Sequence, residues 1–382
     1  MVDGVVMNKK IMVVFGTRPE AIKMCPLIKE LKKREFAEVV ICVTGQHRQM
    51  LDQVLSAFNI EANYDLAIMK EKQDLFDITN AVLNGMKKVL EIEKPNIVLV
   101  HGDTTTAFAT ALACFYLKIS VGHVEAGLRT YSVFSPYPEE FNRQATGIIA
   151  QYHFSPTIMS KNNLIKEGKN PDNIYVTGNT AIDALKTTVR DDYEHDVLSW
   201  AADSKLILIT AHRRENIGLP MHNMFRAIRR VVENHPNVKA VYPIHLNPVV
   251  REIAQKEFEG NERIRIIEPL DVVDFHNFMS KSYFILTDSG GIQEEAPSLG
   301  KPVLVMRNTT ERPEGLDAGG LQLVGTEEEA IYLACESLLN DREKYNNMTQ
   351  AKNPYGDGHA CERIADVLEH GFISSEIKYL DK

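Results

Sequence analysis

Three carboxylates follow apolar segments of the chain at points where a side chain can act on a ligand. Asp103 comes shortly after the apolar run Asn96–Val100, and Glu125 comes directly after Ser120–Val124. Glu139 stands in the segment SPYPEEFNR, where a helix is expected to begin. Carboxylates close to a reacting carbon serve as general acids and bases. From position alone, Glu125 suits a side chain that points into a cleft, whereas Asp103 also suits a helix N-cap and Glu139, like Glu140, suits the helix dipole.

A second group of side chains suits an anion such as a phosphate. Arg18 follows the apolar run Ile11–Phe15 and opens a predicted helix, whose N-terminal N–H groups attract anions. In the second half of the chain His212 follows Leu206–Thr210 in a similar loop, and Arg312 lies in TTERPEG. Each of these loops taken alone also fits an ordinary turn with a surface cation, or a structural histidine. Together they indicate a site for a phosphorylated ligand.

The segment TDSGGIQEE gives the strongest single signal of this kind. Gly290 and Gly291 stand between a predicted strand and a predicted helix, with Ser289 directly before them. Two glycines there let backbone N–H groups approach an anion closely. Glu295 follows one helical turn later and is placed to accept hydrogen bonds from sugar hydroxyls. The segment therefore predicts a site for a nucleotide-linked ligand.

The elements that must position these loops alternate along the chain. Short β-branched runs are followed by amphipathic stretches such as Pro19–Arg34, Thr105–Tyr116 and Pro220–Asn234, which is typical of βαβ units. The apolar runs do not alternate with polar residues, as expected for strands of a parallel sheet buried on both faces. The predicted fold is α/β, with two Rossmann-like, doubly wound parallel-sheet domains facing an interdomain cleft.

The two series of strands and helices are separated by a polar stretch. We expect an N-terminal domain over 9–177 and a C-terminal domain over 178–356, with the hinge near Thr177–Asn179. The final helix, in 357–382, is expected to pack back on the first domain. Ligands of doubly wound folds bind at the carboxyl ends of the strands, so the cleft is the expected site.

Composition excludes several classes of protein. The chain has 382 residues and a net charge of −9, which argues against a general nucleic-acid binder. Its five scattered cysteines form no CxxC pair, so a disulfide framework is not expected. This cysteine usage favours a cytoplasmic setting. No apolar run is long enough to span a membrane. No G-x-G-x-x-G follows a strand, no P-loop motif occurs, and no histidine spacing predicts a metal site.

The ordered motifs are similar to those of one family. FGTRPEAIKMCPLI, TGQHRQMLDQVL, VHGDTTTAFA, GHVEAGLRT, SPYPEEFNR, GNTAIDAL, TAHRREN, HLNP, TDSGGIQEEAPSLGKPV and TTERPEG follow one another from about Lys10 to the NPYGDGHA tail. This chain resembles the non-hydrolysing UDP-N-acetylglucosamine 2-epimerases of bacterial type, which have a GT-B fold. The resemblance implies interconversion of UDP-GlcNAc and UDP-ManNAc through elimination of UDP to a 2-acetamidoglucal, without a cofactor or metal.

The resemblance also implies roles for particular residues. Asp103, Glu125 and Glu139 match acid/base candidates, although which acts on which face of C2 is left open. His212 matches a catalytic and diphosphate-binding position. The further substrate-binding positions implied are Arg18, Lys23, Leu270, Phe275, Ser289, Gly290, Gly291, Glu295 and Arg312. A second, regulatory UDP-GlcNAc is implied at Gln46, Gln49, Lys72, Arg213 and His245, where Lys72 replaces the arginine of close relatives and leaves the strength of regulation open.

The implied partners are UDP-GlcNAc and UDP-ManNAc, a second UDP-GlcNAc as activator and a second copy of the chain in a homodimer. Neither a nucleic acid nor a membrane is expected as a partner. The product would supply ManNAc units for cell-surface polysaccharide. Three alternatives stay open: a hydrolysing relative that releases free ManNAc, a GT-B glycosyltransferase and a non-catalytic UDP-sugar sensor.

Overall fold

The computed structural model describes residues 8–45, 48–70, 72–310 and 312–380, with the backbone alone described for 48–50 and 372–380. The chain divides into two compact units. The first comprises residues 1–187 and 356–382, and the second comprises 188–355. The first boundary therefore falls at the end of helix α7 (Thr180–Thr188), whereas the expected boundary at 177/178 lay before that helix.

The described part of the first unit holds a seven-stranded sheet in the order β3-β2-β1-β4-β5-β6-β7, and every pairing in it is parallel. Its strands are β1 (Lys9–Phe15), β2 (Ala37–Val43), β3 (Tyr64–Asp65), β4 (Ile97–His101), β5 (Ser120–Val124), β6 (Tyr152–Ser155) and β7 (Ile174–Val176). Residues Ile11–Phe15 have no exposed surface, because helices cover both faces of the sheet.

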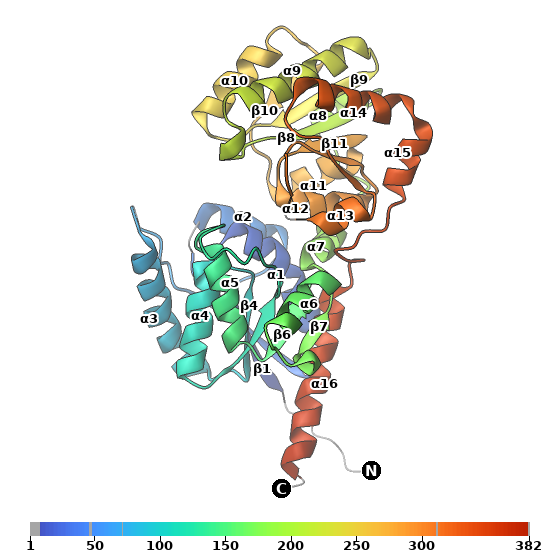
Figure 1. Cartoon of the computed structure of the whole chain (residues 1–382). Helices are drawn as coiled ribbons and strands as arrows, with labels where there is room; N and C mark the ends of the chain where they lie inside the picture. The colour runs from blue at the N-terminus through green and yellow to red at the C-terminus, as the bar shows by residue number, and fades with distance from the viewer. Residues whose placement is uncertain (1–7, 46–47, 71, 311, 381–382) are drawn as a thin grey trace. The chain divides into compact units, whose positions relative to one another are not determined.

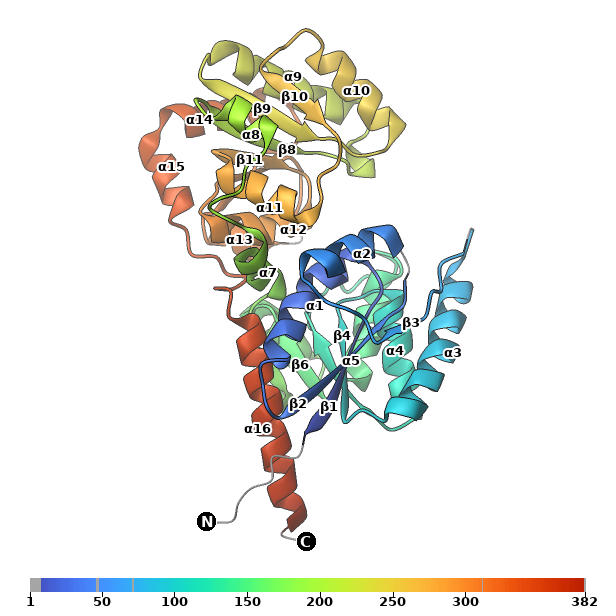
Figure 2. The same cartoon turned by 180° about the vertical axis from the view of Figure 1, so that it is seen from behind.

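The helices of the first unit form two layers, which Figures 1 and 2 show from opposite sides. In one layer α3 (Leu75–Glu93), α4 (Thr105–Tyr116) and α5 (Glu139–Ile149) contact one another in turn. In the other, α1 (Arg18–Leu31) contacts α2 (Arg48–Ala57) and the final helix α16 (Ala360–Leu380). Helix α6 (Ile158–Lys166) connects β6 to β7. The final helix thus belongs to the first unit.

The described part of the second unit holds a six-stranded parallel sheet in the order β10-β9-β8-β11-β12-β13. Its strands are β8 (Lys205–Thr210), β9 (Val238–Pro243), β10 (Ile264–Ile267), β11 (Phe284–Thr287), β12 (Val303–Val305) and β13 (Leu321–Leu323). Its helices are α8 (Asp196–Ala201), α9 (Leu219–Asn234), α10 (Pro248–Phe258), α11 (Val272–Lys281), α12 (Gly290–Glu295), α13 (Pro313–Asp317), α14 (Glu328–Asn340) and α15 (Arg342–Thr349).

Each unit has its own apolar core, and the predicted α/β class with two parallel sheets is confirmed. Four strands were missed from the sequence: β3, β6, β7 and β13. They have two to four residues each, which is too short to show a hydrophobic period. In both sheets the carboxyl ends of the parallel strands share one edge, so the loops that follow adjacent strands become neighbours.

Candidate functional site

In the first unit the loops after β4 and β5 are brought together by strand register. His101, the last residue of β4, pairs with Val124, the last residue of β5. The next residues, Gly102 and Glu125, therefore lie beside each other, and both have positive φ angles of 61° and 64°. Glycine adopts that conformation at little cost, whereas Glu125 adopts it at some cost in energy.

The carboxylate of Glu125 is anchored through one oxygen. Its Oε2 accepts hydrogen bonds from the Lys23 ammonium and, at 2.9 Å, from the Asn179 amide. The Nε2 atom of His101 lies 3.6 Å from the same oxygen. Burial alone would raise the pKa of Glu125, but Lys23 and His101 outweigh burial and hold its pKa well below the ordinary 4.5. Glu125 is therefore an ionised carboxylate in a mostly buried position.

Asp103 is held by different partners on the same edge of the sheet. Its carboxylate accepts a hydrogen bond from the guanidinium of Arg143, and its backbone carbonyl accepts one from the Asn142 amide at 3.0 Å. Burial lowers the pKa of His123 to about 3, so its ring is neutral. The Nε2 atom of His123 lies 2.7 Å from the Gly102 carbonyl oxygen, which fixes the loop that carries Asp103.

The structure separates the two adjacent glutamates of the SPYPEEFNR segment. Glu140 is completely buried and accepts hydrogen bonds from the Thr130 and Tyr131 N–H groups, both at 3.0 Å. Glu139, the first residue of α5, is half-buried, and no side-chain contact is found for it among the described residues. Glu140 therefore has a structural role, and Glu139 is the one of the two that a ligand can reach.

The loop that carries Arg18 differs from the expected phosphate cradle. Glu20 is 2% exposed, and its Oε2 accepts from the N–H groups of Gly16 and Thr17 at 3.0 and 2.8 Å. Its Oε1 accepts from the Thr104 hydroxyl at 2.7 Å, next to Asp103. The two backbone donors of this loop are thus already paired in a capping box. Glu20 instead ties the Arg18 loop to the Asp103 loop.

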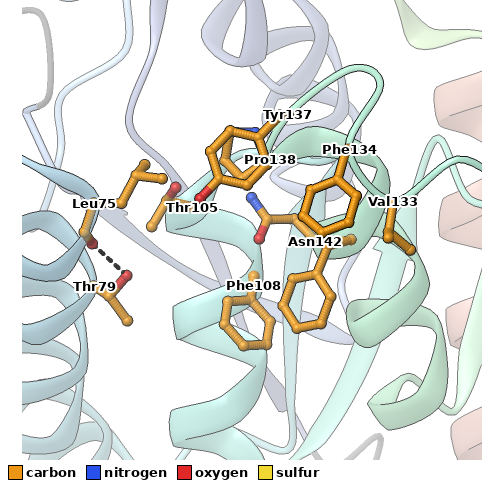
Figure 3. Close-up of a pocket in the computed structure, with 10 residues that line it drawn as sticks. Leu75, Thr79, Thr105, Phe108, Val133, Phe134, Tyr137, Pro138 and Asn142 are labelled. Carbon is orange, nitrogen blue, oxygen red and sulfur yellow. Dashed lines mark hydrogen bonds between the residues drawn. The ribbon is translucent and has the colours of Figure 1, made fainter.

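A cavity of about 290 Å³ lies beside Thr105, two residues after Asp103, and Figure 3 shows the side chains that line it. Its surface is mainly apolar, and the Asn142 amide and the Thr105 hydroxyl lie among the aromatic rings. The lining residues are Leu75, Thr79, Thr105, Phe108, Val133, Phe134, Tyr137, Pro138, Phe141 and Asn142. None of these residues was singled out from the sequence, because their side chains come from α3, α4, α5 and the loop before α5.

In the second unit a buried aspartate organises the loop after β8. Asp288 has no exposed surface and follows β11, the neighbour of β8. Its carboxylate accepts from the N–H of His212 at 3.0 Å, from the N–H of Arg213 at 2.9 Å and from the Asn216 amide at 3.0 Å. The His212 ring is 44% exposed and stacks on His245, with centroids 5.2 Å apart. Asp288 thus presents His212 at the surface.

The glycine-rich segment begins α12 in the same unit. Ser289 is the N-cap residue, and a Cβ atom added to Gly290 would lie 3.4 Å from the Arg312 guanidinium carbon. A Cβ atom on Gly291 would meet nothing within 4 Å. The Nε of Arg312 donates to the buried Glu294 at 2.8 Å, which fixes its guanidinium over Gly290. Gly290 therefore leaves room for the Arg312 guanidinium, and the space beside Gly291 is open.

The other predicted positions of the second unit are Glu295, Leu270 and Phe275. Glu295 ends α12, and its Oε2 lies 3.6 Å from the Nε2 of buried His276. Leu270 lies in the loop before α11 and Phe275 lies in α11, and both are half-buried.

The structure describes the side chains of three of the five predicted regulatory positions. Arg213 and His245 lie beside His212. Lys72, in the first unit, is exposed and has a positive φ of 57°. Gln46 and the side chain of Gln49 lie outside the described residues. Among the residues that are described, no group of three or more histidine, cysteine or acidic side chains could hold a metal ion, and no helix could cross a membrane.

The family model described as UDP-N-acetylglucosamine 2-epimerase matches residues 29–369. The UDP-N-acetylglucosamine 2-epimerase of Bacillus subtilis (strain 168) is 62% identical over 359 residues, which are 94% of each chain. The chain belongs to the UDP-N-acetylglucosamine 2-epimerase family. The crystal structure of a family member from Neisseria meningitidis, bound to UDP-GlcNAc, is 50% identical, with a TM-score of 0.85 over 94% of this chain and 99% of that one. The Methanocaldococcus jannaschii epimerase in complex with UDP-GlcNAc and UDP is 34% identical, with a TM-score of 0.78 over 94% and 99%.

Several residues that organise these candidate loops had no role assigned from the sequence. They are Glu20, His101, Arg143, Asn179 and Asp288. Each stands inside a motif that carries the family resemblance, so its only signal in the sequence was its place near residues to which the resemblance gives a role. Their partners lie between 2 and 84 positions away in the chain, and most of these pairings cannot be read from local spacing.

Proposed function

We propose that this protein interconverts UDP-GlcNAc and UDP-ManNAc by inversion at C2 of the sugar, without releasing free sugar. Family membership supports the substrate, since relatives carry this name and two of their structures hold UDP-GlcNAc. The observation that carries the chemistry is Glu125, a mostly buried carboxylate kept ionised by Lys23. An ionised carboxylate in such a site is suited to accept a proton from carbon.

The proposed reaction has two balanced steps. In the first, a carboxylate takes the proton from C2, the C–H electron pair forms a C1=C2 bond, and UDP leaves C1 with the C1–O electron pair. In the second, a proton reaches the other face of C2, and an oxygen of the UDP diphosphate forms the bond to C1 again. The intermediate is a 2-acetamidoglucal, and no cofactor is consumed.

The proposed roles follow the contacts found in each unit. In the first unit Glu125, Asp103 and Glu139 would move protons at C2, and Arg18 would add positive charge at the diphosphate. Lys23 would keep Glu125 ionised before the proton is taken. Negative charge grows on the diphosphate as the C1–O bond breaks, so nearby cations stabilise that transition state.

In the second unit the proposed role is to bind UDP. His212 and Arg312, with the N–H groups of the Ser289–Gly291 segment, would hold the diphosphate. Glu295 would accept from the ribose hydroxyls, and Leu270 and Phe275 would flank uracil. The contacts of Asp288 with the His212 loop and of Glu294 with Arg312 support this role, because both cationic side chains start from fixed positions.

The proposal also includes regulation and assembly. A second UDP-GlcNAc would bind at Gln46, Gln49, Lys72, Arg213 and His245, and the stacking of His245 on His212 supports a link between the two sites. The protein would act as a homodimer. Its product would supply ManNAc units for a cell-surface polysaccharide.

The function is tested by incubating the protein with UDP-GlcNAc in deuterated water. We expect UDP-ManNAc with deuterium at C2, measured by NMR. Glu125→Gln should lower kcat about 10²-fold to 10⁴-fold, the usual contribution of a general base, while UDP binding changes little. Glu91→Gln, an exposed change on α3, is the matched control and should leave the rate unchanged.

Three results would contradict the proposal. Absence of both UDP-ManNAc and deuterium at C2 would rule out epimerisation. Accumulation of free ManNAc with UDP would indicate a hydrolysing enzyme instead. Equal rates for Glu125→Gln and the wild type would remove Glu125 from the chemistry.

A further inference from the structure

Two sequence motifs have no part in the function proposed above. GNTAIDAL and NPYGDGHA stand where the chain leaves the first unit, at residue 187, and where it returns, at residue 356. They are far apart in sequence but lie together within the first unit. We call residues 177–187 and 356–363 the joint.

Hydrogen bonds lock the two segments of the joint to each other. The carboxylate of Asp183, 7% exposed, accepts from the N–H groups of Ala360 and Cys361 at 3.2 and 2.9 Å, at the start of α16. The Arg363 guanidinium donates to the Thr177 carbonyl at 3.0 Å. Hydrogen bonds therefore hold two distant parts of the chain together in the joint.

Gly356 brings the second segment of the joint into contact with the first near Asn179. Gly356 has a φ of +140°, and a Cβ atom there would lie 3.4 Å from both the Asn179 nitrogen and the Gly178 Cα. Those distances are ordinary van der Waals contacts, so residue 356 packs against the backbone that carries Asn179, and its φ angle favours glycine.

The side chain of Asn179 connects the joint to Glu125. Asn179 is 2% exposed, and its Oδ1 accepts from the Ala181 N–H at 3.0 Å, at the start of α7. Because that oxygen is used as an acceptor, the amide orientation is set and the nitrogen faces the other way. The nitrogen donates to Glu125 Oε2 at 2.9 Å.

The partners of Glu125 all lie at one of its two oxygens. Lys23, Asn179 and His101 face Oε2, whereas Oε1 lies beside Gly102, 3.6 Å from where a Cβ atom would be. No hydrogen bond to Oε1 is found in the part of the chain that the structure describes. One oxygen is thus anchored, and the other is left to meet a substrate.

We propose that Asn179 is a positioning residue for the reaction: its amide anchors Oε2 of Glu125 so that Oε1 takes the substrate proton. The proposal rests on the proposed function, because it names a residue that acts through Glu125. It also gives the joint a role, since the segments that connect the two units then control the orientation of a catalytic carboxylate.

Asn179→Asp tests this assignment sharply. Aspartate has nearly the same size as asparagine and caps a helix equally well, so the contact with Ala181 is retained. Its second oxygen, however, faces Glu125 Oε2 as an acceptor and adds a like charge. The charged groups that face Oε2 are Lys23 and, when protonated, His101, and neither removes this new repulsion fully.

The measurement is the pH profile of kcat and KM for UDP-GlcNAc, made with the full-length protein. We expect kcat of Asn179→Asp to fall about tenfold to hundredfold, part of the 10²-fold to 10⁴-fold that acid–base catalysis contributes, with KM little changed. The acid limb of kcat should move to higher pH by about one unit, because a like charge raises the pKa of Glu125.

Asp183→Asn is the matched control, since it loosens the joint without touching Glu125. It should lower the thermal midpoint and leave the acid limb in place. Asn179→Ser, which can still cap α7, replaces Asn179→Asp if that variant does not fold, and should lower kcat without a comparable shift of the acid limb.

The outcomes separate the two proposals. If the wild type forms no UDP-ManNAc, the proposed function fails. If the wild type is active and Asn179→Asp keeps its kcat and its acid limb, the assignment of Asn179 is wrong. An equal loss of stability and rate in Asn179→Asp and Asp183→Asn, with no shift of the acid limb, would give Asn179 a purely structural role and would also overturn the assignment.

Discussion

Asp288 shows how a single buried charge can determine the shape of a binding loop. It is fully buried, yet its Oδ2 accepts from the N–H groups of His212 and Arg213 and from the Asn216 amide, and its Oδ1 accepts from the His212 N–H at 3.2 Å. A buried carboxylate needs hydrogen-bond donors in place of water, and these groups provide them. In return Asp288 fixes the backbone that carries His212 and Arg213.

Asp288→Asn is expected to weaken UDP binding. The amide nitrogen of asparagine would replace one carboxylate oxygen and face an N–H donor, so the His212 loop must shift. The Kd for UDP, measured by calorimetry, should rise at least about tenfold, which corresponds to about 1.4 kcal/mol. Asp203→Asn, an exposed change before β8, is the control, and an equal Kd for both variants would contradict the role of Asp288.

At the level of helices and loops, the capping box of α1 does more than cap the start of a helix. Thr17 and Glu20 form the box, and Glu20 also reaches the Thr104 hydroxyl in the loop before α4. Helix α3 has the same motif, formed by Asp74 and Asp77, but there both residues are exposed and bond only to each other. The two boxes therefore form a natural comparison.

Glu20→Ala and Asp77→Ala should differ in their effects on activity. Asp77→Ala should lower the free energy of unfolding by about 1 kcal/mol, as loss of a cap does. Glu20→Ala should cost about 2–4 kcal/mol, because several buried donors lose their acceptor. Only Glu20→Ala should also lower kcat, by about tenfold or more, since it frees the Asp103 loop. Denaturant unfolding and kcat are the measurements, and an unchanged kcat for Glu20→Ala would contradict the link.

Considered as a whole, the chain contains two units with separate cores, and the second unit contains an intrinsic fluorescent probe. Trp200 is the only tryptophan of the sequence. It lies in α8 of the second unit, with Arg265 and Lys239 over its ring at 4.3 and 4.8 Å from the centroid. Its fluorescence should therefore report the unfolding of the second unit.

UDP should stabilise the unit that Trp200 reports. At a UDP concentration 100 times its Kd, mass action raises the free energy of unfolding by about 2.7 kcal/mol. The midpoint of denaturant unfolding, followed by Trp200 fluorescence, should shift accordingly. The same UDP concentration should give a smaller shift in Asp288→Asn. A wild-type midpoint that does not respond to UDP would contradict UDP binding by the second unit.

Much of the fold was predictable because it depends on local patterns. Apolar runs such as Ser120–Val124 and helices such as Thr105–Tyr116 have the expected bounds, since burial and helix formation act on neighbouring residues. Four short strands, β3, β6, β7 and β13, were not predicted, because they are stabilised mainly by pairing with neighbouring strands of the sheet. Residue type also identified Asp103, Glu125 and His212 as candidates, and their roles stay predictions.

The amino-acid order alone was enough for the alternation of strands and helices, the family and the set of polar residues at the strand ends. The three-dimensional arrangement was needed to distinguish Glu140 from Glu139, to show that the Gly16 and Thr17 N–H groups are already paired, and to show that Asn179 holds Glu125. The physical reason is that each of these outcomes depends on which oxygen meets which donor. That depends on strand order and register, which bring residues from separate elements within hydrogen-bond distance.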